Sequence, residues 1–252
     1  MDTVTGPRVH VQADLASGEI VPLEREQVHY LANVLRLKAG AGVLAFNGRQ
    51  GEWLCEIEPA GRKDVALRGL RQVRAQPPAG DLHYLFAPLK SARLDYMAQK
   101  AVEMGASLLQ PVLTRRTQVS RVNTDRLAAN AVEAAEQCGI LSVPPVAPEM
   151  KLDRALAALA ADRLLIFCDE AAEVANPVEA LRPFRREGIA ARPLALIIGP
   201  EGGFDEAERR LMLARPHTVR LSLGPRILRA DTAAVAALAI VQTILGDWGN
   251  GA

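Results

Sequence analysis

Residues 194–205 read LALIIGPEGGFD, and this stretch indicates the fold more clearly than any other. Its first five residues are all apolar, as expected for a strand that is buried on both faces of a parallel sheet. A glycine-rich turn follows, and Asp205 with Glu208 three residues later is typical of the capping box that begins a helix. Loops after the carboxyl ends of parallel strands are where open α/β sheets bind ligands. The stretch therefore predicts a strand, a glycine-rich loop and a helix. The loop either binds a ligand or is only a tight strand-to-helix turn, and the composition favours neither.

Two further strand ends are candidates for the same pocket. The sequence LSLGPRILRADTA (221–233) predicts a strand and a Gly-Pro loop, followed by a helix that begins near Asp231 or Thr232 and extends to Leu245. That helix is apolar almost all round, which favours burial in the domain or in a subunit interface. A third strand end, FCDE (167–170), is a weaker candidate for the pocket wall, because acidic residues after a strand are usually solvated.

Strand and helix patterns alternate in the rest of the chain after residue 80. Apolar runs predict strands over 83–87, 108–113, 164–168 and 219–223. Apolar stripes at helical spacing predict helices over 94–105, from 125 to 138, and over 152–161. Such alternation is typical of a parallel α/β sheet.

The chain before residue 75 has a different pattern. Short or alternating apolar runs predict strands over 43–46, 53–57 and 65–73, and Val28, Leu31, Ala32 and Leu35 fall at the spacing of one helix. The sequence AQPPAG (75–80) that follows is typical of a linker. We therefore expect two domains: a small β-rich domain over 1–75 and an α/β domain over 80–252.

Composition and motifs exclude several classes of protein. The 252 residues carry a net charge of +1, so the whole chain shows no basic signal for nucleic acid. Three distant cysteines, no zinc-ligand spacing of histidines, no leader sequence and no long apolar run predict a cytoplasmic protein without a metal, a disulfide framework or a membrane span. Neither a Gly-Lys-Ser/Thr loop nor a GxGxxG motif is present, which argues against a nucleotide-binding α/β enzyme.

One local region is basic. Residues 83–126 contain seven Lys and Arg against three Asp and Glu, and Arg93 and Lys100 share one face of the predicted helix. Such a patch is a candidate for phosphate contacts. The alternative is an ordinary solvated face.

Taken together, the motifs resemble those of the SPOUT methyltransferases. GPEGGF (199–204) and LSLGPRILRADTA (221–233) are similar to the two C-terminal signatures of that superfamily. The sequences LKSARLDYMAQKAVEMGASLLQPVLTRR (89–116) and EAAEQCG (133–139) resemble the 16S rRNA (uracil-N3)-methyltransferase family, and HYLANVLRLKAG (29–40) resembles the PUA-like domain of that family. The resemblance covers nearly the whole chain.

The resemblance implies a SPOUT-type parallel sheet with a deep C-terminal trefoil knot, an exception to the rule that chains do not thread loops. It also implies a small N-terminal PUA-like barrel, a homodimer, and S-adenosylmethionine as the cofactor, bound in the knot. The implied reaction is methylation of N3 of a uridine in 16S rRNA, within the assembled small ribosomal subunit. Two alternatives stay open: methylation of another RNA position, such as a ribose 2′-O or a tRNA base, and RNA binding without catalysis.

The resemblance also assigns candidate roles to residues. Arg116 first and Arg229 second are candidates to stabilise charge on the uracil, and Glu201 or water is the candidate general base. The cofactor candidates are Cys168, Gly199, Pro200, Glu201, Gly202, Leu221, Leu223, Gly224, Ile227, Leu228 and Ala233. The RNA-binding candidates are Arg36, Lys90, Arg93, Lys100, Arg115 and Arg116.

The chain departs from the family pattern at two positions. Tyr30 stands where the family often has a second histidine, and Ile140 stands where it often has arginine. Neither lies in the cofactor motifs, so the departures concern contacts with RNA.

Overall fold

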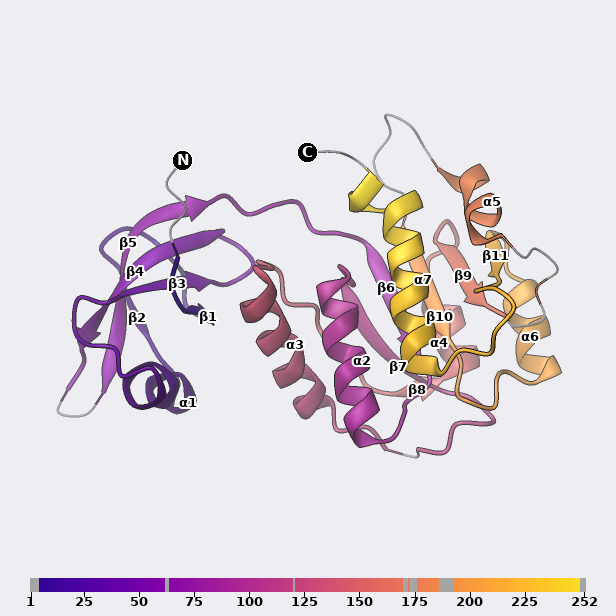
Figure 1. Cartoon of the computed structure of the whole chain (residues 1–252), viewed down its shortest axis with the longest axis horizontal. Coiled ribbons are helices and arrows are strands. Elements are labelled where there is room, and N and C mark those ends of the chain that lie inside the picture. Colours follow the sequence, from indigo (N-terminus) through magenta and orange to yellow (C-terminus); the bar gives the residue numbers. More distant parts are fainter. Residues whose placement is uncertain are drawn as a thin grey trace. The chain divides into compact units, whose positions relative to one another are not determined.

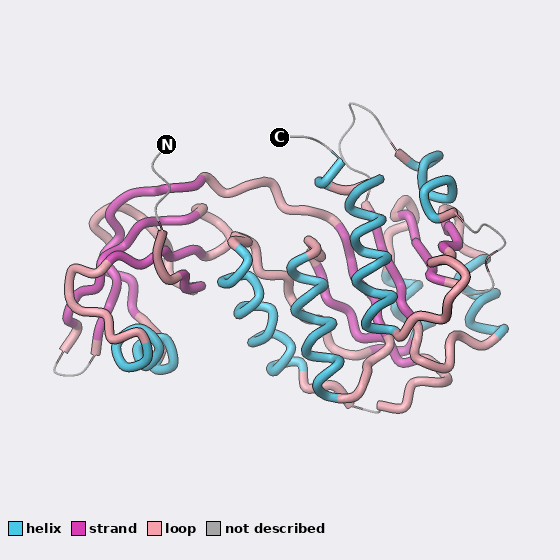
Figure 2. The backbone as a smooth tube through the Cα atoms, in the orientation of Figure 1, coloured by secondary structure: helices cyan, strands magenta, loops and turns pink. Residues whose placement is uncertain are grey.

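The chain divides into two compact units. The computed structural model describes residues 5–61, 64–119, 121–169, 172, 176–185 and 193–249. One unit comprises Met1–Ala79 with Ala135–Val143, and the other comprises Gly80–Ala134 with Pro144–Ala252. Each is described by itself below (Figures 1 and 2).

The N-terminal unit is built on a five-stranded sheet. Its order is β1-β3-β4-β5-β2, with β1 parallel to β3 and the other neighbours antiparallel. The strand bounds are β1 Arg8–His10, β2 Ile20–Pro22, β3 Gly42–Phe46, β4 Glu52–Pro59 and β5 Val65–Arg74. The three strands predicted from the sequence are confirmed as β3, β4 and β5. The strands β1 and β2 were not predicted, because three residues are too few to display an alternating pattern.

The single helix predicted around Leu31 forms in a modified way. A four-residue helix α1, Arg25–Val28, continues as the π-helix η1, His29–Val34. The Leu35 amide donates to the Tyr30 carbonyl five residues back, at 2.9 Å. This wider hydrogen-bonding pattern breaks the spacing assumed from the sequence, so Leu31 is buried whereas Leu35 is exposed.

The C-terminal unit contains a six-stranded sheet in which all neighbours are parallel, as predicted from the alternation of strands and helices. Its order is β11-β9-β10-β6-β7-β8. The strand bounds are β6 Leu82–Phe86, β7 Leu108–Leu113, β8 Met150–Lys151, β9 Leu164–Cys168, β10 Leu194–Ile198 and β11 Thr218–Leu221. All five residues of the central strand β10 are buried, which explains its continuous apolar run.

Helices cover both faces of this sheet (Figure 1). Their bounds are α2 Ser91–Glu103, α3 Thr124–Cys138, α4 Leu152–Ala158, α5 Pro177–Leu181, η2 Arg182–Phe184, α6 Glu206–Leu213, α7 Ala230–Ile244 and η3 Asp247–Gly249. One face packs against α4 and α6, with side chains such as Leu156, Phe167 and Met212 in a shared core. The helices α2, α3 and α7 lie on the other face.

The apolar C-terminal helix α7 packs against α2, α5 and β10. It begins at Ala230, slightly before the predicted start, with Arg229 as its N-cap. Ala234, Leu238 and Val241 are fully buried, as the apolar sequence predicts. No helix in the described ranges has both the length and the hydropathy needed to span a membrane.

Candidate functional site

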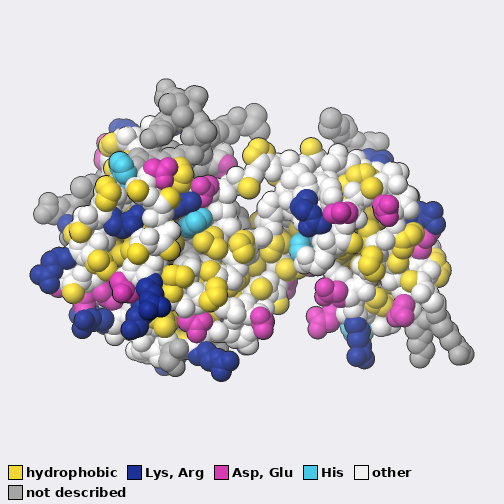
Figure 3. Space-filling view, turned by 180° about the vertical axis from the view of Figure 1, so that it is seen from behind, with side chains coloured by type: hydrophobic (Ala, Val, Ile, Leu, Met, Phe, Trp, Pro, Cys, Tyr) yellow, Lys and Arg dark blue, Asp and Glu magenta, His cyan; other side chains and the backbone are white. Residues whose placement is uncertain are grey.

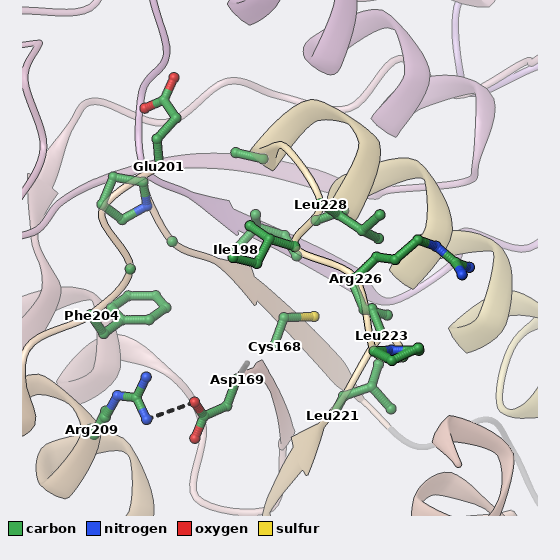
Figure 4. Close-up of a pocket in the computed structure, with 18 residues that line it drawn as sticks. Cys168, Asp169, Ile198, Glu201, Phe204, Arg209, Leu221, Leu223, Arg226 and Leu228 are labelled. Atoms are coloured by element: carbon green, nitrogen blue, oxygen red, sulfur yellow. Dashed lines mark ion pairs between the residues drawn. The ribbon is translucent and has the colours of Figure 1, made fainter. Parts of the chain in front are cut away.

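The carboxyl ends of β9, β10 and β11 lie side by side at one edge of the sheet and open into a pocket (Figure 4). Of the predicted cofactor residues, those that line it are Cys168, Gly199, Pro200, Glu201, Leu221, Leu223, Gly224, Ile227, Leu228 and Ala233. Gly202 does not line the pocket, and Gly203 does. The three strand ends that the sequence singled out therefore meet at one place.

The loop after β10, residues 199–205, is tightly held. Gly203 donates its amide to the Pro200 carbonyl at 2.8 Å, closing the turn. A Cβ atom added at Gly199 would lie 2.8 Å from the ring of Phe204, so glycine is required there by close contact. That ring is buried and stands edge-on to Phe167, with centroids 5.2 Å apart. The aromatic side chain thus ties the loop to the core of the unit.

The predicted capping box at the start of α6 is confirmed. The Asp205 carboxylate accepts the Glu208 amide at 2.8 Å, and the Glu208 carboxylate accepts the Asp205 amide at 3.0 Å. These reciprocal bonds satisfy two amides that a helix start leaves without intrahelical partners. The capping box therefore fixes the position of Asp205, where the loop enters α6.

The loop after β11, residues 222–229, is much more open. Ile227 lines the pocket, yet its exposed fraction is 92%. Arg226 and Arg229 are exposed, and within the described ranges neither side chain makes a hydrogen bond or ion pair. In Figure 4 the Arg226 guanidinium points away from the pocket, as does the Glu201 carboxylate, whereas the Cys168 thiol points inward.

A buried charge cluster at the pocket wall was not predicted. Asp169 is 3% exposed, and its two oxygens lie 2.8 Å from Arg209 of α6 and 2.8 Å from Arg220 of β11. The sequence singled out only the acidic member, because the three positions become neighbours only through the strand order β11-β9-β10. Glu170, named with Asp169, lies outside the described residues.

Cys168 contributes a neutral thiol to the pocket. Burial raises its pKa well above the ordinary value, and the neighbouring Asp169 carboxylate raises it further. A protonated thiol behaves as a small apolar group. It is therefore compatible with the apolar side chains of Ile198, Leu221 and Leu223 around it.

Two predicted arginines lie against the glycine-rich loop. The Arg116 guanidinium donates to the Gly202 carbonyl at 2.5 Å, and the Arg93 guanidinium lies 3.7 Å from the Glu201 carboxylate. Arg115 extends into solvent and lies 3.2 Å from Asp205. The basic stretch 83–126 thus reaches the pocket from α2 and from the segment after β7.

The other RNA-binding candidates lie elsewhere. Lys100 is paired with Glu103 at 2.7 Å and lies over the ring of Tyr96, whereas Lys90 is an exposed N-cap of α2. Arg36 is exposed in the N-terminal unit, with a φ of 54°. On the face drawn in Figure 3, cationic and anionic side chains are interspersed rather than segregated.

Two family profiles match the chain. The RNA methyltransferase domain matches residues 75–242, and the RNA methyltransferase PUA domain matches residues 23–68. The N-terminal unit is therefore of the PUA type, and the parallel α/β unit carries the methyltransferase domain.

Several similar proteins have related names. The chain is 29% identical to ribosomal RNA small subunit methyltransferase E of Rickettsia conorii, over 94% of this chain and 95% of the relative, and 26% identical to the Bacillus subtilis protein of the same name, over 86% and 87%.

Two solved structures resemble the whole chain. One is a putative methyltransferase from Legionella pneumophila in complex with S-adenosylmethionine, with a TM-score of 0.80 and 28% identity over 95% of this chain and 98% of that one. The other is ribosomal RNA small subunit methyltransferase E from Neisseria gonorrhoeae bound to S-adenosylmethionine, with a TM-score of 0.79 and 25% identity over 94% and 97%. The resemblance drawn from the motifs is confirmed: the chain belongs to the RNA methyltransferase family, with its PUA domain preceding the catalytic domain.

Proposed function

We propose that this protein transfers a methyl group from S-adenosylmethionine to N3 of a uridine in 16S rRNA. The observation that carries the proposal is the pocket at the ends of β9, β10 and β11, whose glycine-rich loop bonds directly to Arg116. The relatives named as small-subunit rRNA methyltransferases, and the similar structures bound to S-adenosylmethionine, support both the cofactor and the class of RNA. The proposal assigns RNA binding to residues 1–75 and catalysis to residues 80–252.

The pocket fits this cofactor by the chemistry of its lining. Apolar side chains of Ile198, Leu223 and Leu228 suit a purine ring, and the two glycine-containing turns bring backbone N–H and C=O groups close enough to read its edges. The Asp169 carboxylate is buried in the pocket wall, where it is paired with Arg209 and Arg220. S-adenosylmethionine supplies an electrophilic methyl group on its sulfonium. We propose that the two loops hold it within a deep trefoil knot.

The residues beside the pocket have distinct roles in the proposed reaction. Uracil N3 carries an imide proton that must leave, and negative charge develops on the base as it does. Arg116 is our first candidate to stabilise that charge, because its guanidinium is anchored on the Gly202 carbonyl at the pocket edge. Arg229 is the second candidate, and Glu201 or water is the candidate base.

The substrate must be accessible RNA. N3 lies on the Watson–Crick edge, so the target uridine must be unpaired or splayed out. We propose that Arg93 and Arg115 contact phosphates near the pocket. Lys90 and Lys100 would extend that surface along α2, and Arg36 would contact phosphates in the N-terminal unit. We further propose that the substrate is the assembled small subunit, and that the enzyme works in the cytoplasm, where ribosomes are assembled.

We also propose a homodimer. Ile227 and Trp248, which flank α7 in the sequence, expose 92% and 53% of their surface, and burial of this apolar surface against a second chain would stabilise a dimer. Light scattering of the purified protein tests this point directly, and a monomer at micromolar concentration would contradict it.

The decisive experiment measures transfer of a labelled methyl group from S-adenosylmethionine to small subunits from cells that lack this enzyme, followed by nucleoside analysis. We expect labelled 3-methyluridine. Label in another nucleoside, or only in tRNA, would move the activity to another RNA position. Binding of the cofactor without label in any RNA would contradict the reaction, and absence of cofactor binding would exclude an enzyme of this class.

Replacing Arg116 by Ala tests its role. Removing a group that stabilises developing charge typically lowers kcat by about 10²- to 10³-fold. We expect a loss of that order, with the dissociation constant of S-adenosylmethionine nearly unchanged, and a smaller loss for Arg229→Ala. A larger effect of Arg229→Ala would reverse the assignment of the two arginines.

A further inference from the structure

Glu208 makes one contact more than its helix cap requires. It is 7% exposed, and one of its oxygens accepts the Asp205 amide in the capping box described above. The other oxygen accepts the backbone amide of Arg115 at 2.8 Å, from a segment 93 residues earlier in the chain. A buried carboxylate is costly unless its oxygens are hydrogen-bonded, and both oxygens of Glu208 are.

The second contact joins two segments that strand order keeps apart. Arg115 follows β7, whereas Glu208 belongs to the helix after β10, and β6 lies between these two strands in the sheet. A capping box alone would need no partner from β7. The position of the Glu208 carboxylate therefore sets where the segment after β7 lies relative to the glycine-rich loop.

Three more contacts connect the same segments. The Asp205 carboxylate lies 3.2 Å from the Arg115 guanidinium. The Arg116 guanidinium donates to the Gly202 carbonyl at 2.5 Å. A Cβ atom added at Gly202 would lie 3.4 Å from Cδ of Arg116, so the arginine side chain packs directly on the turn. We call this group, Gly202, Asp205, Glu208, Arg115 and Arg116, the loop clamp.

The loop clamp connects the turn that lines the pocket to Arg116, the first catalytic candidate. On one side, four residues of the turn line the pocket: Gly199, Pro200, Glu201 and Gly203. On the other side is Arg116, whose backbone amide is adjacent in sequence to the one that Glu208 holds. A shift in the turn therefore moves both the carbonyl that anchors the Arg116 guanidinium and the carboxylate that holds the neighbouring backbone amide of Arg115.

We propose that Glu208 is a positioning residue that couples occupation of the pocket to the placement of the Arg116 guanidinium. This inference rests on the function proposed above. Glu208 does not line the pocket, and it acts through the backbone of the segment after β7.

A double-mutant cycle of Glu208→Gln and Arg116→Ala provides the test. Glutamine preserves the size of the side chain but replaces one oxygen by an NH₂ group, which faces an N–H donor and loses one of the two bonds. Because displacement of a catalytic group by about 1 Å can cost about 10²-fold, we expect kcat to fall by about 10- to 100-fold. The dissociation constant of S-adenosylmethionine should change by less than about twofold, and Glu208→Gln should cause no further loss in the Arg116→Ala background.

Matched variants control for charge and folding. Glu206→Gln removes the same charge from the exposed first turn of α6 and should leave kcat unchanged. Asp205→Asn keeps a competent helix cap while removing the ion pair with Arg115, so it should lower kcat in the same direction as Glu208→Gln but less. It provides the test if Glu208→Gln does not fold.

Hydrogen exchange gives a readout that does not require methyl transfer. In the wild-type protein, we expect S-adenosylhomocysteine to slow exchange in the peptide covering residues 114–117, although these residues do not line the pocket. In Glu208→Gln this slowing should be lost while the ligand still binds. If S-adenosylhomocysteine slows exchange at residues 114–117 but the protein does not methylate small subunits, the result would support the loop clamp and overturn the proposed substrate.

Three outcomes overturn the coupling. Additive losses in the double-mutant cycle would show that Glu208 acts independently of Arg116. A loss of cofactor affinity as large as the loss of kcat would show that Glu208 only caps α6. If the wild-type protein methylates RNA but the ligand does not slow exchange at residues 114–117, this inference alone would be refuted. If the protein binds no cofactor, both this inference and the proposed function would be refuted.

Discussion

The two loops that line the pocket from β10 and β11 differ in how firmly the rest of the protein holds them. Residues 199–205 are fixed by a turn hydrogen bond, the buried ring of Phe204, a capping box and a bond from Arg116. Residues 222–229 expose Ile227 almost completely, and in the described part of the chain the side chains of Arg226 and Arg229 make no hydrogen bond or ion pair.

This contrast indicates that the two loops contribute to ligand binding in different ways. A loop that already has its bound shape loses little conformational freedom when a ligand binds, and such preorganisation increases affinity. An exposed loop becomes ordered only through contacts with the ligand, with RNA or with a second protein chain. We therefore expect changes in residues 199–205 to alter the stability of the free protein as well as binding, and changes in residues 222–229 to leave the stability of the free protein unchanged.

The largest expected effect on cofactor affinity follows from filling the space at Gly199. In Gly199→Ala the new methyl group would lie 2.8 Å from Phe204, whose buried ring cannot move without disturbing Phe167. Overpacking of this kind costs about 1–3 kcal/mol, which corresponds to about 5- to 150-fold in affinity if the loop is displaced. Isothermal titration with S-adenosylmethionine and a thermal melt measure both consequences.

Gly80→Ala is the matched control, because a Cβ atom at Gly80 meets only a carbonyl oxygen at the ordinary distance of 3.8 Å. It should change neither quantity. If Gly199→Ala binds the cofactor as tightly as the wild-type protein does, the loop is not held in the way described.

A smaller effect is expected from Ile227→Ser in the open loop. Because the side chain is 92% exposed in the free protein, its loss should leave the melting temperature unchanged. If a bound cofactor covers about half of this side chain, affinity should fall by about 4- to 12-fold, since full burial of isoleucine contributes about 1.5–3 kcal/mol. Leu211→Ser on α6, where the side chain is 42% exposed and does not line the pocket, should leave affinity unchanged. A lower melting temperature for ligand-free Ile227→Ser would contradict the contrast between the loops.

The sequence predicts the structure of residues 199–205 better than it predicts the contacts that these residues make with the rest of the protein. Apolar runs such as LALII (194–198) and the Asp205–Glu208 spacing are local signals, and both predicted what the structure contains. The bond from Glu208 to Arg115 has no local signal, because it depends on β7 lying two strands from β10. A carboxylate that caps its own helix looks the same in sequence whether or not its second oxygen reaches another segment.

The same reason explains the unpredicted charge cluster. Asp169 lies tens of residues before Arg209 and Arg220 in the sequence, and the three come together because β9 lies between β10 and β11. Periodicity predicts that strands exist and which faces are buried, but it does not give their order in the sheet. The π-helix at His29–Val34 is a different kind of failure, since its wider turn contradicts the 3.6-residue spacing on which the prediction was based.

The smallest expected effect concerns the reactivity of the pocket thiol, and it tests whether the open loop leaves the pocket accessible. Burial and the neighbouring Asp169 raise the pKa of Cys168, and thiolate rather than thiol reacts with iodoacetamide. At pH 7 the exposed Cys138 should therefore be labelled first, and labelling of Cys168 should increase with pH up to and beyond pH 9.

Cys55 provides an internal control for this measurement, because burial raises its pKa to about 11 and it lies in the N-terminal unit. S-adenosylhomocysteine should slow the labelling of Cys168 but not that of Cys55, as measured by peptide mass spectrometry. If the ligand slows the labelling of Cys168 alone, then iodoacetamide reaches the pocket of the free protein past residues 222–229. This result is expected if the rest of the protein does not hold that loop closed. Labelling of Cys168 that is as fast as that of Cys138 at pH 7, or that is insensitive to the ligand, would mean that the thiol does not lie in the binding pocket as described.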